Sequence, residues 1–301
     1  MSPDNVQPWI FAPPPAVARS VTFRCVPEAE PRAALQRLAD VFQPAWGVVG
    51  VGQPLVRLLE REIAGLKAFP ALAGAGHVAP STQQALWMLL CGADSTPIFD
   101  RFEKVRAALA PAFVVDDAID TFTYAGGRDL TGYVDGTENP VDEAAHEAAL
   151  LMAEERLGGA SFVAVQRWAH DLARFRAFSP ERRDHTIGRR IGDNEEIDEA
   201  PESAHVKRAA QESFDPHAFL VRRSMPWANA HTQGLEFISY TNALDKFERI
   251  LRRMLGLDDG IVDALFSFSR ALTGGYYWCP PLVDGALDWK ALGIAPAGPR
   301  K

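Results

Sequence analysis

The residues best suited to acid–base chemistry lie in the stretch Gly132-Tyr133-Val134-Asp135-Gly136-Thr137-Glu138-Asn139-Pro140. Its glycines permit positive φ angles and a close approach of the backbone to a ligand, and Asn139 is pushed towards extended geometry by the proline that follows it. We therefore expect a rigid loop that holds the carboxylate of Asp135, as a catalytic acid or base requires. The alternative is that Asp135 only caps its own turn.

A cation and a hydroxyl lie farther along, in Phe219-Leu220-Val221-Arg222-Arg223-Ser224-Met225-Pro226-Trp227. A guanidinium in an apolar strand is costly to bury without a negative partner, so at least one arginine is expected to face a site. Because side chains alternate along a strand, we expect Arg222 and Ser224 to line one pocket while Arg223 points the other way. The alternative is that both arginines occupy an exposed strand end.

His205 is a candidate ligand or catalytic residue, because it follows the acidic run 193–199 where a polar loop meets a new element. A single histidine is more often an ordinary surface or core residue. Spacing alone does not choose between His205, His185 and His217.

The composition predicts a globular protein that acts on a small molecule. The 301 residues are 47% hydrophobic and 23% charged, with a formal net charge of -8 and mixed signs that leave no basic patch for nucleic acid. No apolar run reaches membrane-spanning length, and residues 1–20 lack the features of a signal peptide. Cys25, Cys91 and Cys279 lack zinc-site spacing and are interpreted as reduced core thiols, which favours a cytoplasmic location.

The elements that must position these residues form two similar series. In the first we expect strands at 21–26, 46–51, 84–91 and 113–118 and helices at 31–42 and 96–109. This order, β-α-β-β-α-β, predicts a ferredoxin-like unit of the α+β class, an antiparallel sheet with helices on one face. In the second we expect strands at 161–168, 218–223 and 235–240 and helices at 172–190 and 243–255.

These series divide the chain into four parts. They are a proline-rich arm (1–20), an N-terminal ferredoxin-like domain (21–123), a connection (124–154) and a C-terminal ferredoxin-like domain (155–301). The connection carries Asp135, and a connection of that length in a compact chain is more often functional than idle.

Three segments resemble one known family. Gly132-Tyr133-Val134-Asp135-Gly136 matches the GxxDG motif of dye-decolorizing peroxidases, and Ala204-His205-Val206 and Arg222-Arg223-Ser224-Met225-Pro226 resemble the family's later landmarks in the same order. The resemblance spans most of the chain and is closest to the bacterial B type. It implies two ferredoxin-like domains and one haem b per chain, bound in the C-terminal half.

The resemblance also implies roles for the residues around the peroxide. Asp135 and Arg222 would lie on the distal side of the haem, where Asp135 moves a proton between the oxygens of hydrogen peroxide and Arg222 stabilises developing charge. Ser224 would stand beside Arg222, at a position where many relatives have asparagine.

On the other side of the haem, the resemblance makes His205 the proximal ligand of the iron. Asp263 would accept a hydrogen bond from the outer nitrogen of His205, although a solvated helix residue is an equal alternative. Arg189 would pair with a haem propionate.

The implied activity is the reduction of hydrogen peroxide through a ferryl porphyrin radical, with oxidation of small aromatic or dye-like donors. Trp168, Tyr276, Tyr277 and Trp278 are candidate surface relays for electrons, although aromatic clusters are more often core packing. The family commonly forms homo-oligomers. Two other interpretations are a haem- or porphyrin-handling protein with incidental peroxidase activity, and a non-haem protein in which Asp135 and Arg222 form a structural ion pair.

Overall fold

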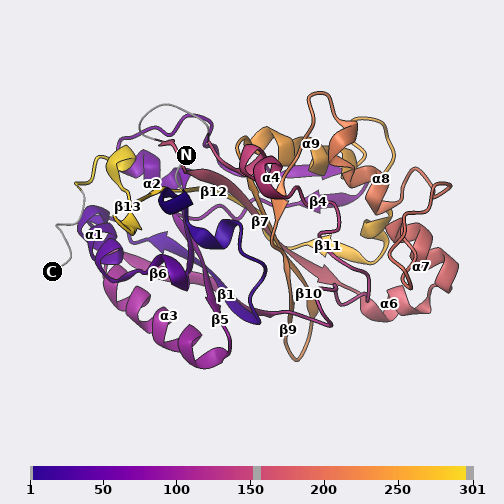
Figure 1. Ribbon diagram of the computed structural model, residues 1–301, viewed down its shortest axis with the longest axis horizontal. Helices are drawn as coiled ribbons and strands as arrows, with labels where there is room; N and C mark the ends of the chain where they lie inside the picture. Colours follow the sequence, from indigo (N-terminus) through magenta and orange to yellow (C-terminus); the bar gives the residue numbers. More distant parts are fainter. Residues whose placement is uncertain (1–2, 152–156, 296–301) are drawn as a thin grey trace.

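The computed structural model describes residues 3–151 and 157–295, which form helices and strands (Figure 1). The strands of the main sheet are β1 (Val17–Cys25), β2 (Gly47–Gly52), β5 (Leu86–Gly92), β6 (Phe113–Phe122), β7 (Ser161–His170), β8 (Val221–Arg222), β9 (Met225–Ala228), β10 (Gln233–Thr241), β11 (Ser269–Ala271) and β12 (Gly275–Cys279). The α-helices of the described residues are α1 (Pro31–Val41), α2 (Gln53–Leu58), α3 (Ser95–Leu109), α4 (Asp142–Ala149), α6 (Leu172–Ala177), α7 (Pro180–Ile187), α8 (His205–Ala209) and α9 (Leu244–Met254). Short hairpins are formed by β3 (Leu72–Gly74) with β4 (His77–Ala79) and by β13 (Leu282–Val283) with β14 (Ala286–Leu287).

The main sheet is antiparallel and closed. Its ten strands run in the order β11-β7-β12-β2-β5-β1-β6-β9-β10-β8, and a further pairing of β7 with β10 completes a ring. The predicted α+β class with antiparallel pairing is confirmed. The two halves of the chain are joined edge to edge, where Trp278 lies opposite Val51 and Thr121 lies opposite Trp227, so they share one sheet.

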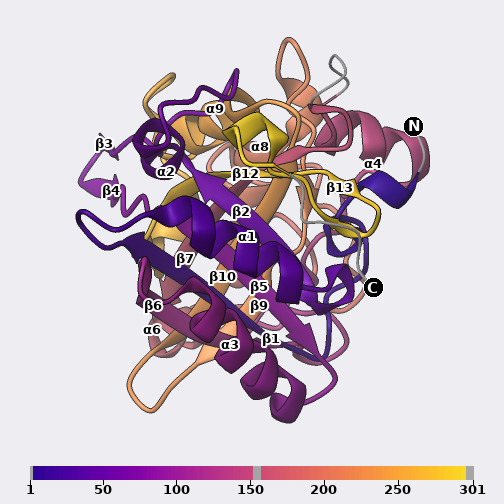
Figure 2. The same ribbon diagram turned by 90° about the vertical axis from the view of Figure 1, so that its left-hand side faces the viewer.

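Helices α1 and α3 cover the outer face of the N-terminal half of this sheet (Figure 2). Helix α1 begins where the side chain of Glu30 accepts a hydrogen bond from the amide of Arg32, with Pro31 in the first turn, where its missing N–H costs nothing. Leu35 and Leu38 are buried against the sheet at helical spacing. The helix predicted at 31–42 is confirmed.

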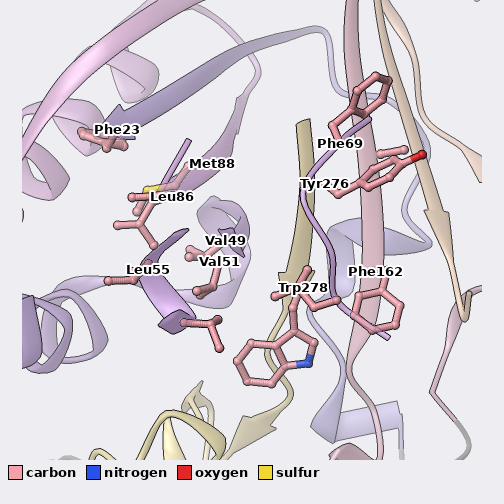
Figure 3. Close-up of a cluster of buried hydrophobic side chains, with 14 of the residues drawn as sticks. Phe23, Val49, Val51, Leu55, Phe69, Leu86, Met88, Phe162, Tyr276 and Trp278 are labelled. Atoms are coloured by element: carbon pink, nitrogen blue, oxygen red, sulfur yellow. The ribbon is translucent and has the colours of Figure 1, made fainter. Parts of the chain in front are cut away.

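Strands β2, β5, β7 and β12 are buried on both faces, which explains their largely apolar sequences. Val49, Val51, Leu86 and Met88 belong to the outer core, together with Trp278 of β12 (Figure 3). Alternate residues form a second cluster inside the ring, where the rings of Trp87 and Tyr277 stack with their centroids 6.1 Å apart.

The inside of the ring also contains a small polar network. The hydroxyl of Ser20 on β1 donates to Glu236 of β10 at 2.7 Å, and Arg167 of β7 donates to the same carboxylate at 3.0 Å. Burial raises the pKa of Glu236, an effect that the charge of Arg167 partly offsets. The network connects β1, β7 and β10, three strands of the ring.

The structure differs from the sequence-based expectations in several elements. The helix expected at 172–190 is two helices, α6 and α7, because Ser179 caps a new first turn that contains Pro180. The strand expected at 218–223 is reduced to β8, and α4, α8, β9, β11 and β12 were not predicted. The last residues of the connection expected at 124–154 lie outside the described residues.

The expected surface relay of aromatic residues is wrong, since Trp168 of β7 is only 5% exposed and belongs to the outer core. Tyr276, Tyr277 and Trp278 are buried in the two cores, as the packing alternative proposed. Cys91 and Cys279 are buried free thiols, and burial raises the pKa of Cys91 to about 12. No helix in residues 3–151 or 157–295 is long and apolar enough to cross a membrane.

Candidate functional site

Two adjoining cavities lie at the C-terminal half of the sheet. The larger lies on the outer side of β7 and β10, beneath the helices α8 and α9, and the smaller lies between the loop of Asp135, the end of α7 and α8. The larger contains about 960 Å³ of space free of protein atoms, its open mouth included, and the smaller about 680 Å³. Asp135, His205 and Arg222 line both of them. Apolar side chains such as Trp168 and Phe247 form the deeper wall of the larger cavity, so a mainly apolar ligand would meet a few polar groups there.

Asp135 is fixed by the loop that the sequence predicted to be rigid. Gly132 and Gly136 adopt φ angles of +93° and +73°, a left-handed region that favours glycine. The side chain of Asn139 accepts a hydrogen bond from the amide of Arg222 at 2.8 Å and donates to its carbonyl at 3.0 Å, which fastens the loop to β8. Burial raises the pKa of Asp135, and the charge of Arg222 partly offsets the rise.

Arg222 faces the cavities with a free donor. Its Nε is buried and has no hydrogen-bond partner among the described residues, although an unsatisfied buried donor is costly. Ser224 is not among the described residues that line either cavity, and its hydroxyl accepts a long hydrogen bond of 3.4 Å from the amide of Ile238. The alternation expected along this segment is interrupted because β8 ends at Arg222 and β9 begins at Met225.

His205 is the first residue of α8, and its ring is held from behind by a buried carboxylate. Its Nδ1 lies 2.8 Å from Oδ2 of Asp263, a side chain that is fully buried. The other oxygen of Asp263 accepts from the amide of Leu265 at 2.8 Å, and the amide of Ala264 donates to the carbonyl of Ser203 at 2.7 Å. The two segments are therefore fastened together directly behind the ring.

The electrostatics of this pair favour a fixed tautomer. Burial lowers the pKa of His205, but the charge of Asp263 and the hydrogen bond to it more than offset this effect, so the net shift is upward. No described residue hydrogen-bonds Nε2 of His205, and the ring is 30% exposed towards the cavities that it lines. An Nδ1–H donated to a carboxylate leaves Nε2 as a strengthened electron-pair donor.

Arg189 follows Gly188, which ends α7 in the left-handed conformation. Its guanidinium donates to Glu138 at 2.5 Å, to Glu196 at 3.2 Å and to the carbonyl of Asn194 at 2.9 Å, and it lines the smaller cavity. An anionic ligand group at this point would have to join or displace Glu138, whose side chain is 61% exposed.

One buried hydrogen-bonded chain at the site was not predicted. His170 Nε2 lies 3.3 Å from Oδ2 of Asp129, and its Nδ1 lies 2.7 Å from the hydroxyl of Ser269. Burial raises the pKa of Asp129, but hydrogen bonds and charge from His170 and Thr131 outweigh this, and the net shift is downward. The partners are 41 and 99 residues apart, so no local sequence signal marks them. Within the described residues, no group of three or more His, Cys, Asp or Glu side chains could hold a metal ion.

Comparisons with known proteins give one consistent result. Residues 126–284 match the family model described as "Dyp-type peroxidase, C-terminal". A dye-decolorizing peroxidase of Mycobacterium tuberculosis is 31% identical over 301 residues, covering 95% of this chain and 86% of the relative. The structure of DyPB from Rhodococcus jostii RHA1 superposes with a TM-score of 0.82 at 28% identity, covering 90% of this chain and 94% of that one. A variant of the same protein solved in complex with heme gives the same TM-score, 0.82, identity and coverage.

Proposed function

This chain belongs to the dye-decolorizing peroxidase family and is a peroxidase, and we propose that it uses one haem b, bound between His205 and the pair Asp135 and Arg222. Bound haem supplies the redox chemistry, because its ferric iron can pass two electrons to hydrogen peroxide and regain them singly from donors. The observation that carries the proposal is the free Nε2 of His205, held by Asp263 and open to cavities that Asp135 and Arg222 also line.

The donor set fits haem. A single imidazole with its outer nitrogen bonded to a carboxylate would be a suitable ligand for haem iron, with Asp135 and Arg222 available to act on the peroxide. The apolar wall that includes Trp168 and Phe247 suits the porphyrin faces. The buried, unpartnered Nε of Arg222 needs an acceptor that the described residues do not provide. The C-terminal half of the chain, residues 155–301, is therefore the proposed haem-binding domain.

The peroxide chemistry is assigned to two side chains. Asp135 would take a proton from one oxygen of hydrogen peroxide and deliver it to the other oxygen, which then leaves as water. Burial raises the pKa of Asp135, which makes its carboxylate a stronger base for this proton transfer than an exposed aspartate. The guanidinium of Arg222 stabilises the negative charge that develops as the O–O bond breaks.

Supporting roles follow from the same geometry. Asp263 orients His205 and increases its donor strength, and Arg189 pairs with a haem propionate after Glu138 moves away. Ser224 is assigned to the distal side. Because Arg222 lines the cavities and Ser224 does not, the short side chain of Ser224 acts on the peroxide only through water. The electron donors are small aromatic or dye-like compounds.

We also interpret each half of the ring as a ferredoxin-like unit. The strands of the first half lie in the order β6-β1-β5-β2, and those of the second half in the order β12-β7-β10-β9. In both halves the fourth strand lies beside the first, followed by the third and the second. A cytoplasmic location is proposed on the basis of the free thiols Cys25, Cys91 and Cys279. A homo-oligomer is proposed from the resemblance to the family.

The test is the absorption spectrum of haem-loaded protein before and after one equivalent of hydrogen peroxide. The wild type should show a ferric Soret band that changes on addition of peroxide and returns when an aromatic donor is added. His205→Ala should lose normal axial ligation, whereas His217→Ala, an exposed histidine that lines neither cavity, should match the wild type. A wild type that binds haem but leaves peroxide intact would favour the haem-handling alternative.

A further inference from the structure

A second, more open groove lies beside the cavities and is lined by four segments that are distant in sequence. They are the β3–β4 turn, the end of β7 with the start of α6, the turn before β10, and residues 266–271. The groove contains about 1420 Å³ of space free of protein atoms, its open side included. Nothing in the proposed peroxide chemistry uses it.

The charge of this groove is opposite to that of the chain as a whole. The protein carries a formal net charge of -8, yet the groove is lined by two exposed arginines, Arg174 and Arg270. Neither guanidinium has a carboxylate partner among the described residues. The one carboxylate in the lining, Asp171, uses Oδ1 to accept from the backbone amide of Arg174 at the start of α6. The groove therefore favours an anion, although solvent screening makes each contact modest.

Aromatic residues lie in the wall of the groove, although Phe266 and Phe268 are only 7% and 3% exposed. The rings of His77 and Phe266 lie 4.7 Å apart with their planes inclined by 32°, and the rings of His170 and Phe268 lie 5.7 Å apart. His231 extends the lining at the turn before β10. The accessible rings of the lining are those of His77, which is half-buried, and His231, which is exposed, and another aromatic ring can stack on them.

Only one layer of side chains separates the groove from the cavity of Asp135 and His205. His170 and Phe268 line both spaces. Trp168 lines the cavity, and its ring lies 5.4 Å from that of Phe266, which lines the groove. A molecule in the groove would thus be close to the proposed haem without entering its cavity.

We propose that this groove is a donor-binding site for aromatic anions, in particular phenols that carry a carboxylate or sulfonate group. This inference rests on the proposed peroxidase function. The anionic group pairs with Arg174 and Arg270, and the phenol ring packs against the rings of His77 and His231. Each donor gives one electron to the oxidised enzyme and its phenolic proton to solvent, and becomes a phenoxyl radical. Two donors with one hydrogen peroxide therefore yield two radicals and two water molecules.

The test is the binding of 4-hydroxybenzoate and its neutral amide, 4-hydroxybenzamide, to haem-loaded protein, measured by isothermal titration calorimetry at low salt. Arg174→Gln and Arg270→Gln should each weaken 4-hydroxybenzoate binding by up to about fivefold, in line with one solvent-exposed ion pair. The neutral amide should bind to the wild type more weakly than the anion does. Its binding should change little in Arg174→Gln and Arg270→Gln. Arg176→Gln is the matched control, because Arg176 lies on α6 but does not line the groove.

Turnover separates this inference from the function on which it rests. With 4-hydroxybenzoate as donor, the groove variants should raise KM while kcat and the rate of reaction with peroxide stay unchanged. Normal turnover with binding and KM unchanged in Arg174→Gln and Arg270→Gln would overturn the donor site and leave the proposed peroxidase function intact. Arginine-dependent binding without turnover of any donor would instead overturn the proposed function, and the donor role with it.

Discussion

The substitution Asp263→Asn removes the negative charge that acts on His205. Asp263 makes two hydrogen bonds: Oδ2 faces Nδ1 of His205 at 2.8 Å, and Oδ1 accepts from the amide of Leu265 at 2.8 Å. Asparagine has nearly the same shape. With its oxygen turned towards His205 the imidazole keeps a neutral acceptor, and the amide nitrogen then faces the N–H of Leu265, so the hydrogen bond that caps residues 264–267 is lost together with the charge.

The size of the effect follows from the difference between charged and neutral acceptors. A hydrogen bond to a charged group contributes about 1.5–3 kcal/mol and a neutral one about 0.5–1.5 kcal/mol. The loss of about 1–1.5 kcal/mol at a fully buried carboxylate corresponds to about a tenfold change in a binding constant. Outer partners of metal-bound histidines have effects of about 10–100-fold, so this value lies at the low end.

The assay is titration of haem-free protein with haem, followed at the Soret band, together with the reduction potential of the bound iron. Asp263→Asn should bind haem about tenfold more weakly, and its potential should rise, because a weaker donor stabilises ferric iron less. Asp258→Asn is the matched control, since Asp258 forms an exposed ion pair with Arg252 in the same segment. Affinity and potential that both equal the wild-type values would refute the assignment of Asp263 as a charge acting through His205.

Three further outcomes are expected. Arg222→Ala should slow the reaction with peroxide by about 10²–10³-fold, more than Asp135→Asn does. The charge of Arg222 lowers the pKa of Asp135, so its loss should also move the acid limb of the pH–rate profile to higher pH. An acid limb that does not move would contradict this coupling. Trp278→Ala should lower the free energy of urea unfolding by about 3–5 kcal/mol. Trp278→Phe should lower it clearly less, because the buried indole nitrogen has no partner among the described residues and its removal breaks no hydrogen bond. Equal decreases in the two variants would contradict this account. Gly234→Ala places a Cβ 1.9 Å from the carbonyl oxygen of Trp168 and should lower the melting temperature sharply. The added Cβ of Gly192→Ala meets nothing within 4 Å, so that variant should match the wild type. Similar melting temperatures for the two variants would argue against the close approach at Gly234.

Local sequence signals predicted most of the individual elements. Helix α1 and strand β5 lie within one or two residues of their expected limits, because capping and apolar periodicity are encoded by neighbouring residues. The glycine-flanked turn of Asp135 was predicted for the same reason. Its attachment to β8 through Asn139 was not, since the two hydrogen-bond partners are separated by 83 residues.

The position of Ser224 illustrates a different limit. Strand alternation predicted that its side chain would share a pocket with Arg222, but the strand stops after that residue. Residues at this break make long-range contacts. The guanidinium of Arg223 donates a hydrogen bond to the carbonyl of Phe11, near the start of the chain, at 2.7 Å. A periodic pattern holds only where the backbone continues the strand, and contacts of this range are not visible in a local window.

Closure of the sheet also depended on contacts that no local pattern contains. The two halves meet through short pairings, Trp278 opposite Val51 on one side and Thr121 opposite Trp227 on the other. The proposed site does not span these junctions, since His205, Arg222 and the loop of Asp135 all lie within residues 126–284, the part that matches the family model. The N-terminal half therefore contributes to the site indirectly. By supplying the strands that complete the ring, it buries the inner face of β7 and β10, whose outer face carries the wall of the cavity.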